Sequence, residues 1–94
     1  MNINLEAVCE SLMLNNIPTS FIDDDEIIIN NQKITVQNGI FLIKKIRMRF
    51  TGLRDFLFAL QNAEIINFSK EQVNNILLNY SFLLCEHETI SDND

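Results

Sequence analysis

The fold is decided by residues 33–50, which read KITVQNGIFLIKKIRMRF. Near the middle lies Asn38-Gly39, a pair that favours the two-residue turn of a β-hairpin because both residues tolerate positive φ angles. Counting outward from this turn sets Val36 opposite Phe41 in two antiparallel strands. The stretch therefore predicts a hairpin whose register is known.

An earlier turn at Asn30-Asn31 extends this prediction toward the N-terminus. Two asparagines also tolerate the φ angles of a type I′ turn, and here they set Ile27 opposite Ile34. Residues that lie directly opposite each other share a face of the sheet. Both turns therefore predict the same apolar face, which consists of Ile27, Ile29, Ile34, Val36, Phe41 and Ile43.

The alternation of apolar and polar residues breaks at Lys44-Lys45. In an unbroken strand, Arg47 and Arg49 would then point toward the core. One extra residue in the strand would send both arginines to solvent, so we predict a β-bulge at Lys44-Lys45. The alternative is a strand with both faces partly covered, in which acidic side chains balance the arginines.

Helical periodicity predicts three helices around the sheet. The first covers residues 4–15, before the strands, and the second covers about residues 52–64. The third begins after Ser69, which forms a capping box with Gln72, and it runs to about Glu86.

The predicted fold class is α+β. An N-terminal helix is followed by a three- to four-stranded antiparallel β-meander and by two C-terminal helices packed on one face of the sheet. In this prediction residues 1–88 form a single α+β domain, and residues 89–94 form a disordered acidic tail.

Nothing in the chain of 94 residues approaches the apolar run of about 20 residues that a membrane span needs. Its first ten residues carry two glutamates and no basic residue, which differs from a secretory signal. We therefore expect a cytoplasmic protein that does not bind a membrane, in which Cys9 and Cys85 stay reduced.

The net charge of −6 is divided among three segments of the sequence. Residues 1–32 hold six acidic and no basic residues, whereas residues 33–54 hold six basic and no acidic residues. Residues 55–94 hold seven acidic residues and one lysine. Such an acidic chain is a poor general binder of nucleic acid, although its basic middle segment alone would permit binding.

Four consecutive acids form one candidate partner-binding patch, which consists of Asp23, Asp24, Asp25 and Glu26. Aspartates favour tight turns, because their carboxylates accept hydrogen bonds from nearby backbone amides. Adjacent carboxylates can also hold a divalent metal, but these lack the alternating spacing and the glycine of a calcium loop. We therefore predict a turn and no metal site.

A second candidate surface is basic and consists of Lys45, Arg47, Arg49 and Arg54. Strand residues two positions apart share a face, so these side chains can contact phosphates along a nucleic-acid backbone. Aromatic residues for base stacking are few, and only Phe41 lies near that face. The simpler interpretation is a solvated strand that the protein's own acids partly balance.

The third predicted helix is apolar on more than one face. Leu78, Phe82 and Cys85 form a second apolar stripe at helical spacing. Either the first helix or another protein chain covers this stripe. Leu78 and Phe82 are therefore candidate partner-binding residues, and a homo-oligomer through this helix is one form of the prediction.

Catalytic chemistry has few candidates. His87 is the only histidine, and it lies two residues from Cys85 near the predicted end of a helix. These side chains point to different helix faces, and adding Cys9 would still leave a zinc site without its fourth ligand. We predict no catalytic residue, no metal and no cofactor, with a small thiol or metal enzyme as the remote alternative.

These features predict a non-enzymatic protein-binding module that acts as an inhibitor, immunity or adaptor protein. One concrete version is an anti-CRISPR-like inhibitor of a host defence nuclease, encoded by a phage or a mobile element. Its acidic patch would occupy a basic groove on the target. The alternative is a nucleic-acid-binding protein that uses the basic residues 44–54.

Overall fold

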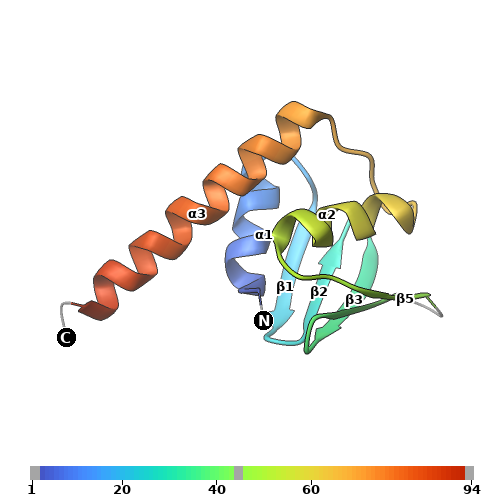
Figure 1. Cartoon of the computed structure of the whole chain (residues 1–94), viewed down its shortest axis with the longest axis horizontal. Helices are drawn as coiled ribbons and strands as arrows, with labels where there is room; N and C mark the ends of the chain where they lie inside the picture. Colours follow the sequence, from blue (N-terminus) through green and yellow to red (C-terminus); the bar gives the residue numbers. More distant parts are fainter. Residues whose placement is uncertain (1–2, 44–45, 93–94) are drawn as a thin grey trace.

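The structure is a computed structural model that describes residues 3–43 and 46–92, with residues 86–92 described by their backbone alone. Within these ranges, three helices and a five-stranded antiparallel sheet confirm the α+β class (Figure 1). The sheet is a meander in the order β1-β2-β3-β4-β5, so the predicted three to four strands were too few. In chain order the elements are α1 (Leu5–Leu14), β1 (Thr19–Asp23), β2 (Glu26–Ile29), β3 (Gln32–Gln37), β4 (Ile40–Ile43), β5 (Ile46–Arg49), α2 (Leu53–Asn62) and α3 (Lys70–Asp92).

Both predicted hairpin turns are confirmed. The turn at Asn30-Asn31 has φ angles of 51° and 67°, and the turn at Asn38-Gly39 has φ angles of 51° and 74°. These left-handed values are the ones that a type I′ turn requires. The register on either side is as predicted, and all six residues of the predicted apolar face are buried.

A third reversal of the chain, between β4 and β5, was missed by the sequence analysis. Ile43 pairs with Ile46 in antiparallel register, so the prediction of one long strand is wrong. The bulge that we predicted at Lys44-Lys45 falls outside the described residues. A reversal at this point keeps Ile46 on the face of Ile43, as a bulge would, and leaves both arginines of β5 exposed.

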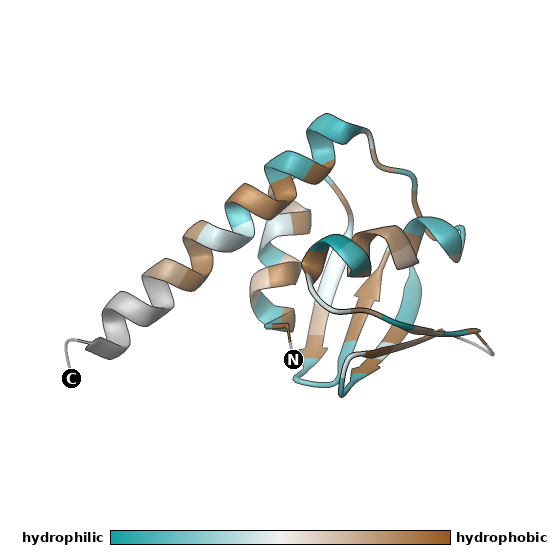
Figure 2. Ribbon diagram, in the orientation of Figure 1, coloured by the Kyte–Doolittle hydropathy of each residue, from teal (hydrophilic) through white to brown (hydrophobic). Residues whose placement is uncertain are grey.

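The core lies between the inner face of the sheet and the helices. Phe56 of α2 is fully buried, and its ring packs edge-to-face on Phe41 and Phe50 at centroid distances of 5.6 and 5.4 Å. Figure 2 shows hydrophobic residues both on the strands and on the helices beside them. Each fully buried side chain of this size contributes roughly 1.5–3 kcal/mol relative to its exposed state.

Side-chain caps begin α1 and α3, whereas the N-cap of α2, Gly52, has none. Asn4 caps α1, because its side chain accepts a hydrogen bond from the Ala7 backbone N–H at 3.1 Å. The capping box of α3 is confirmed as well. The backbone N–H groups of Ser69 and Gln72 donate to each other's side-chain oxygens, at 3.0 and 3.1 Å.

Helix α3 is longer than predicted and projects from the rest of the fold. Whereas α2 packs on the sheet, α3 packs across α1 and the side of α2. The Asn15 side-chain amide donates to Asn79 Oδ1 at 3.0 Å, and the Asn4 backbone N–H donates to the Tyr80 hydroxyl at 3.0 Å. Beyond Tyr80 the backbone stays helical to Asp92, through most of the segment expected to be a disordered tail, and extends away from the sheet (Figure 1). None of the helices in the described ranges is long and apolar enough to cross a membrane.

Candidate functional site

Two of the four carboxylates in the predicted acidic patch are engaged in contacts within the protein. Asp23 Oδ1 accepts hydrogen bonds from the backbone N–H groups of Asp25 and Glu26, at 2.8 and 2.9 Å, which confirms the turn. Glu26 forms an ion pair with Lys33 on the neighbouring strand at 2.9 Å, and this hydrogen bond raises the pKa of Lys33. Of the four, Asp24 and Asp25 therefore have the carboxylates that remain available to other groups.

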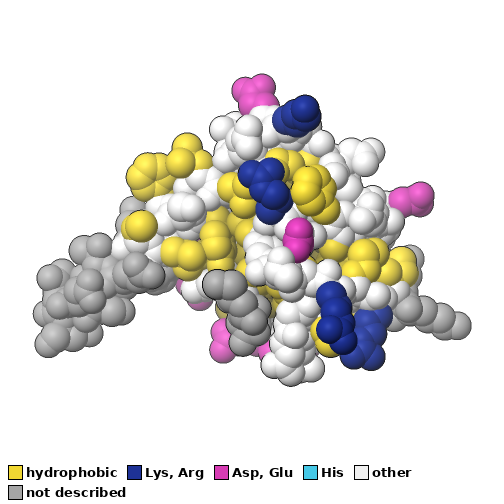
Figure 3. Space-filling view, viewed as in Figure 1, with side chains coloured by type: hydrophobic (Ala, Val, Ile, Leu, Met, Phe, Trp, Pro, Cys, Tyr) yellow, Lys and Arg dark blue, Asp and Glu magenta, His cyan; other side chains and the backbone are white. Residues whose placement is uncertain are grey.

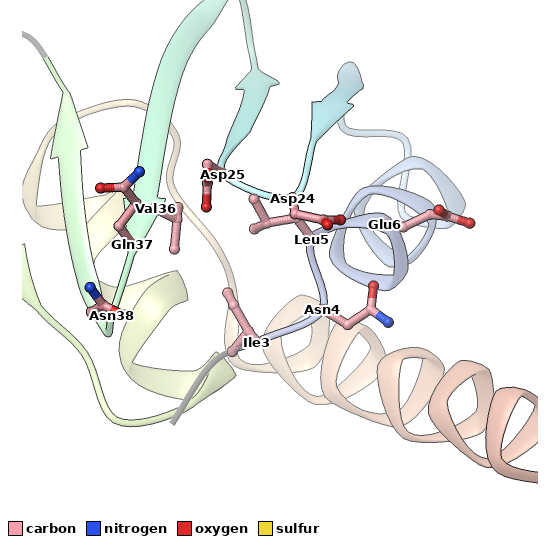
Figure 4. Close-up of a pocket in the computed structure, with 9 residues that line it drawn as sticks. All are labelled: Ile3, Asn4, Leu5, Glu6, Asp24, Asp25, Val36, Gln37 and Asn38. Atoms are coloured by element: carbon pink, nitrogen blue, oxygen red, sulfur yellow. The ribbon is translucent and has the colours of Figure 1, made fainter.

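Asp24 and Asp25 stand at one side of a groove with a volume of about 680 Å³. Its other walls are the start of α1, which carries Glu6, and the β3–β4 turn (Figure 4). In Figure 4 the Glu6 carboxylate points away from Asp25, so the three acids do not converge. Nowhere in the described part of the chain do three acidic, histidine or cysteine side chains come together as a metal site. The groove is an acidic surface that a basic group can approach.

Arg47 and Arg49 lie on the outer face of the sheet, which is the face turned away from the helices. Both are exposed, and they stand opposite Leu42 and Ile40 of β4. No described acid forms an ion pair with either arginine. The arginines of β5 are therefore held in solvent rather than balanced by acids against the core, and the alternative of a strand covered on both faces is wrong.

The other predicted basic residues do not extend this surface. Arg54 is exposed on α2, which packs on the opposite, inner face of the sheet, and Lys45 falls outside the described residues. On the face seen in Figure 3, lysine and arginine side chains form separate groups rather than one belt. Phe41, which we considered for base stacking, is completely buried. The geometry provides two neighbouring arginines without a stacking platform.

β5 is one edge of the sheet, and its outward-facing backbone groups belong to Arg47 and Arg49. In an antiparallel pair of strands, hydrogen-bonded and non-hydrogen-bonded residue pairs alternate. The Phe50 N–H donates to the Gly39 carbonyl at 2.9 Å, so Met48 is the next residue of β5 to bond with β4. The N–H and C=O groups of the two arginines therefore point away from the sheet. No backbone hydrogen bond from another described element reaches them.

β1 is the opposite edge, and α1 covers it. The Asn30 N–H donates to the Pro18 carbonyl at 2.8 Å, and by the same alternation the Phe21 N–H points away from β2. This N–H lies near enough to the Cys9 sulfur of α1 to affect its pKa. Burial raises the pKa of the Cys9 thiol, Glu10 raises it further, and the Phe21 N–H opposes the rise. Cys9 is therefore a neutral thiol that helps to close this edge, a role that the sequence alone did not indicate.

An exposed apolar surface, which we call the α3 face, consists of Leu14, Leu78 and Phe82. Their side chains are 65, 56 and 62% exposed, and Figure 3 shows hydrophobic side chains standing out beside α3. The hydrogen bond between Asn15 and Asn79 joins the residues that follow Leu14 and Leu78. Because α1 packs beside this face without covering it, one of the two alternatives for the second stripe, cover by the first helix, is wrong. Leu14 was missed, because its exposure depends on where α3 crosses α1.

The two cysteines lie in different surroundings. Cys9 is buried and Cys85 is exposed on α3, and both are free thiols. The raised pKa of Cys9 keeps it protonated at neutral pH, where a thiol is a poor nucleophile. The side chain of His87, which the remote enzyme alternative requires, falls outside the described residues.

Comparisons of this chain with protein-family models, with curated proteins and with solved structures found no match.

Proposed function

We propose that this chain is a non-enzymatic protein-binding module that docks on its partner through the α3 face. The observation that supports the proposal most is the exposure of Leu78 and Phe82, at 56 and 62%, on a helix that projects beyond the fold (Figure 1). Large apolar side chains on such a helix leave water when a groove on another protein covers them. Full burial of each contributes roughly 1.5–3 kcal/mol.

The surroundings of the α3 face also favour docking. The described helix positions around Leu78 and Phe82 that are exposed carry no charge, and they are Asn74, Asn75, Ser81 and Cys85. This uncharged stretch of α3, which ends before Glu86, can enter an apolar groove without burying an unpaired charge, which would cost several kcal/mol. The α3 face therefore fits the helix-in-groove mode of recognition.

An inhibitor, immunity or adaptor role would combine the α3 face with the acidic groove. The carboxylates of Asp24 and Asp25 are exposed and can meet a basic surface on the same target. Complementary charge mainly speeds association and excludes wrong partners, whereas the apolar contact supplies the affinity. A phage- or mobile-element-encoded inhibitor of a defence nuclease is one concrete version, because the nucleic-acid groove of a nuclease is basic.

Nucleic-acid binding is the less supported alternative. Arg47 and Arg49 are exposed and can contact phosphates, but no described aromatic residue shares the outer face with them. The net charge of −6 also opposes the approach of a polyanion.

The test compares the wild type with the double variant Leu78→Ser/Phe82→Ser and with Asn62→Ser, a control at an exposed position of α2, away from the α3 face. Capture experiments use a lysate of the source organism, and light scattering measures self-association. We expect the wild type and the control to capture the same protein or to form the same oligomer. The double variant should lose at least tenfold in affinity, because two apolar side chains no longer leave water.

Two outcomes would overturn the proposal. One is a double variant that is folded by circular dichroism and binds the wild-type partner with unchanged affinity. The other is a wild type that stays a monomer and captures no protein.

A further inference from the structure

The open edge at β5 offers a second binding surface, separate from the α3 face. The backbone N–H and C=O groups of Arg47 and Arg49 point outward, so a strand laid beside β5 can hydrogen-bond to both residues. β-Augmentation of this kind draws its affinity from main-chain hydrogen bonds and its specificity from alternate side chains.

The side chains of β5 define the partner's sequence pattern. Arg47 and Arg49 lie on the outer face, whereas Ile46 and Met48 lie on the inner face at the margin of the core. Ile46 is 40% exposed and Met48 is half-buried. Residues opposite each other in paired strands share a face. A partner strand would therefore place one set of side chains against the arginines and the alternate set against these apolar residues.

We propose that the β5 edge binds an extended protein segment in which acidic and apolar residues alternate. Its carboxylates would pair with Arg47 and Arg49, and the apolar residue between them would lie opposite Met48. Hydrogen bonds between guanidinium and carboxylate groups are among the stronger ones in proteins, and Arg can form two of them in parallel. This proposal does not depend on the proposed function of the α3 face.

A second copy of the chain fits this edge poorly. Two β5 strands that paired with each other would bring arginines beside arginines, and like charges directly opposite each other are destabilising. Charged side chains on edge strands are a general device against edge-to-edge association, and these arginines fit it. The same positive charges favour an acidic partner strand. That strand would form hydrogen bonds with the outward backbone groups of β5.

Nucleic acid is the competing occupant, and the surface fits it less well. A phosphate backbone supplies negative charge, but it does not alternate apolar groups with its charges. The two kinds of ligand differ in what they require of β5. Phosphates need only the arginines, whereas a strand also needs the backbone of β5.

The test uses three peptide probes with the full chain. The first is the peptide Val-Glu-Val-Glu-Val, acetylated at its N-terminus and amidated at its C-terminus. The second has Lys in place of both Glu residues. The third is the first peptide with methyl groups on the backbone nitrogens of both Glu residues. NMR titration of the labelled protein measures affinity. We expect the first peptide to shift the β5 resonances and to slow amide exchange at Arg47 and Arg49. The Lys peptide should not bind, and N-methylation should weaken binding at least tenfold because it removes the strand's donors.

Two variants and one further ligand complete the design. The double variant Arg47→Glu/Arg49→Glu should no longer bind the Glu peptide and should bind the Lys peptide instead. Arg54→Glu on α2 should leave the affinity for both peptides unchanged. An oligothymidylate measures nucleic-acid binding at the same low salt concentration. The proposal is overturned by no detectable binding of the Glu peptide at millimolar concentration. It is also overturned if N-methylation leaves the affinity of the Glu peptide unchanged while the oligothymidylate binds the wild type but not the double arginine variant. The edge would then be a surface that binds phosphates through its arginines alone.

Discussion

The two edges of the sheet are protected in different ways. At β1, helix α1 lies over the edge, and its buried Cys9 faces the outward Phe21 N–H. At β5, no described element covers the outward backbone groups, and Arg47 and Arg49 line the edge instead. Open edges invite pairing with other strands unless charge or cover prevents it. Helix α1 blocks the first edge at Phe21 by packing beside it, whereas charge excludes only some partners from the second.

The largest expected effect comes from loosening the covered edge. Leu12 of α1 is completely buried in the core, so Leu12→Ala should lower the free energy of unfolding by about 2–5 kcal/mol. Met48→Ala on the half-buried face of β5 should cost only about 1 kcal/mol, because less apolar area leaves water there. Urea denaturation of both variants checks the difference. Equal losses would mean that β5 is packed as closely as α1.

Removing the cap of α1 should have a smaller effect in the same direction. The Asn4 side chain accepts the Ala7 N–H, so Asn4→Ala should lower the free energy of unfolding by about 1 kcal/mol. Asn4→Asp keeps an acceptor at that position and should stay close to the wild type. Denaturation midpoints compare the three proteins, and an Asn4→Ala variant as stable as the wild type would contradict the capping role.

The covered edge should also give the protein a specific pH dependence. Burial raises the pKa of Cys9 in the folded state, so the folded protein holds this proton more tightly than the unfolded chain does. The associated stability is fully present below the ordinary thiol pKa of about 8.5, and it is lost as the pH rises through the higher folded pKa. The variant Cys85→Ala keeps Cys9, so its free energy of unfolding should fall as the pH is raised from 8 to 10. The free energy of unfolding of Cys9→Ala should fall less over the same range.

Thiol reactivity gives an independent check on that prediction. Cys85 is exposed and should react quickly with a thiol reagent, whereas Cys9 should react only when α1 opens. Equal rates for the two thiols would show that α1 does not cover the edge.

The smallest expected effect on stability comes from the open edge. Arg47→Ala/Arg49→Ala should change the free energy of unfolding by no more than about 0.5 kcal/mol, because both side chains are exposed. Removing their charge should instead promote self-association at high protein concentration, which light scattering would detect. Arg54→Ala on α2 is the matched control and should remain unchanged in both respects. A large loss of stability in the double variant would show that the arginines support the fold.

Local signals account for the parts of the fold that could be predicted. Asn38-Gly39 prefers the φ angles of its turn, and the Ser69 cap depends only on neighbours three residues away. The reversal between Ile43 and Ile46 has no such signal, because the intervening sequence Lys44-Lys45 contains neither the asparagine nor the glycine of the other two turns. A bulge and a two-residue reversal also restore the same alternation of faces, so periodicity could not distinguish them.

The candidate sites depended more on tertiary contacts. Leu78 and Phe82 could be identified from helical spacing, but Leu14 joins them only because α3 crosses the end of α1. The four acids of the acidic patch do not form one surface, because Asp23 accepts hydrogen bonds within its own turn and Glu26 pairs with Lys33 on the neighbouring strand. The open edge could not be predicted, because an edge exists only once the order of strands is known.

Native-state amide hydrogen exchange tests the difference between the two edges most directly. We expect the Arg47 and Arg49 amides to exchange at close to the rate of an unstructured peptide, because their N–H groups point outward from an open edge. The Phe21 amide should exchange much more slowly, because α1 and the Cys9 sulfur cover it. If the Arg47 and Arg49 amides exchanged as slowly as the Phe21 amide, both edges would be closed, and the proposed open edge at β5 would be contradicted.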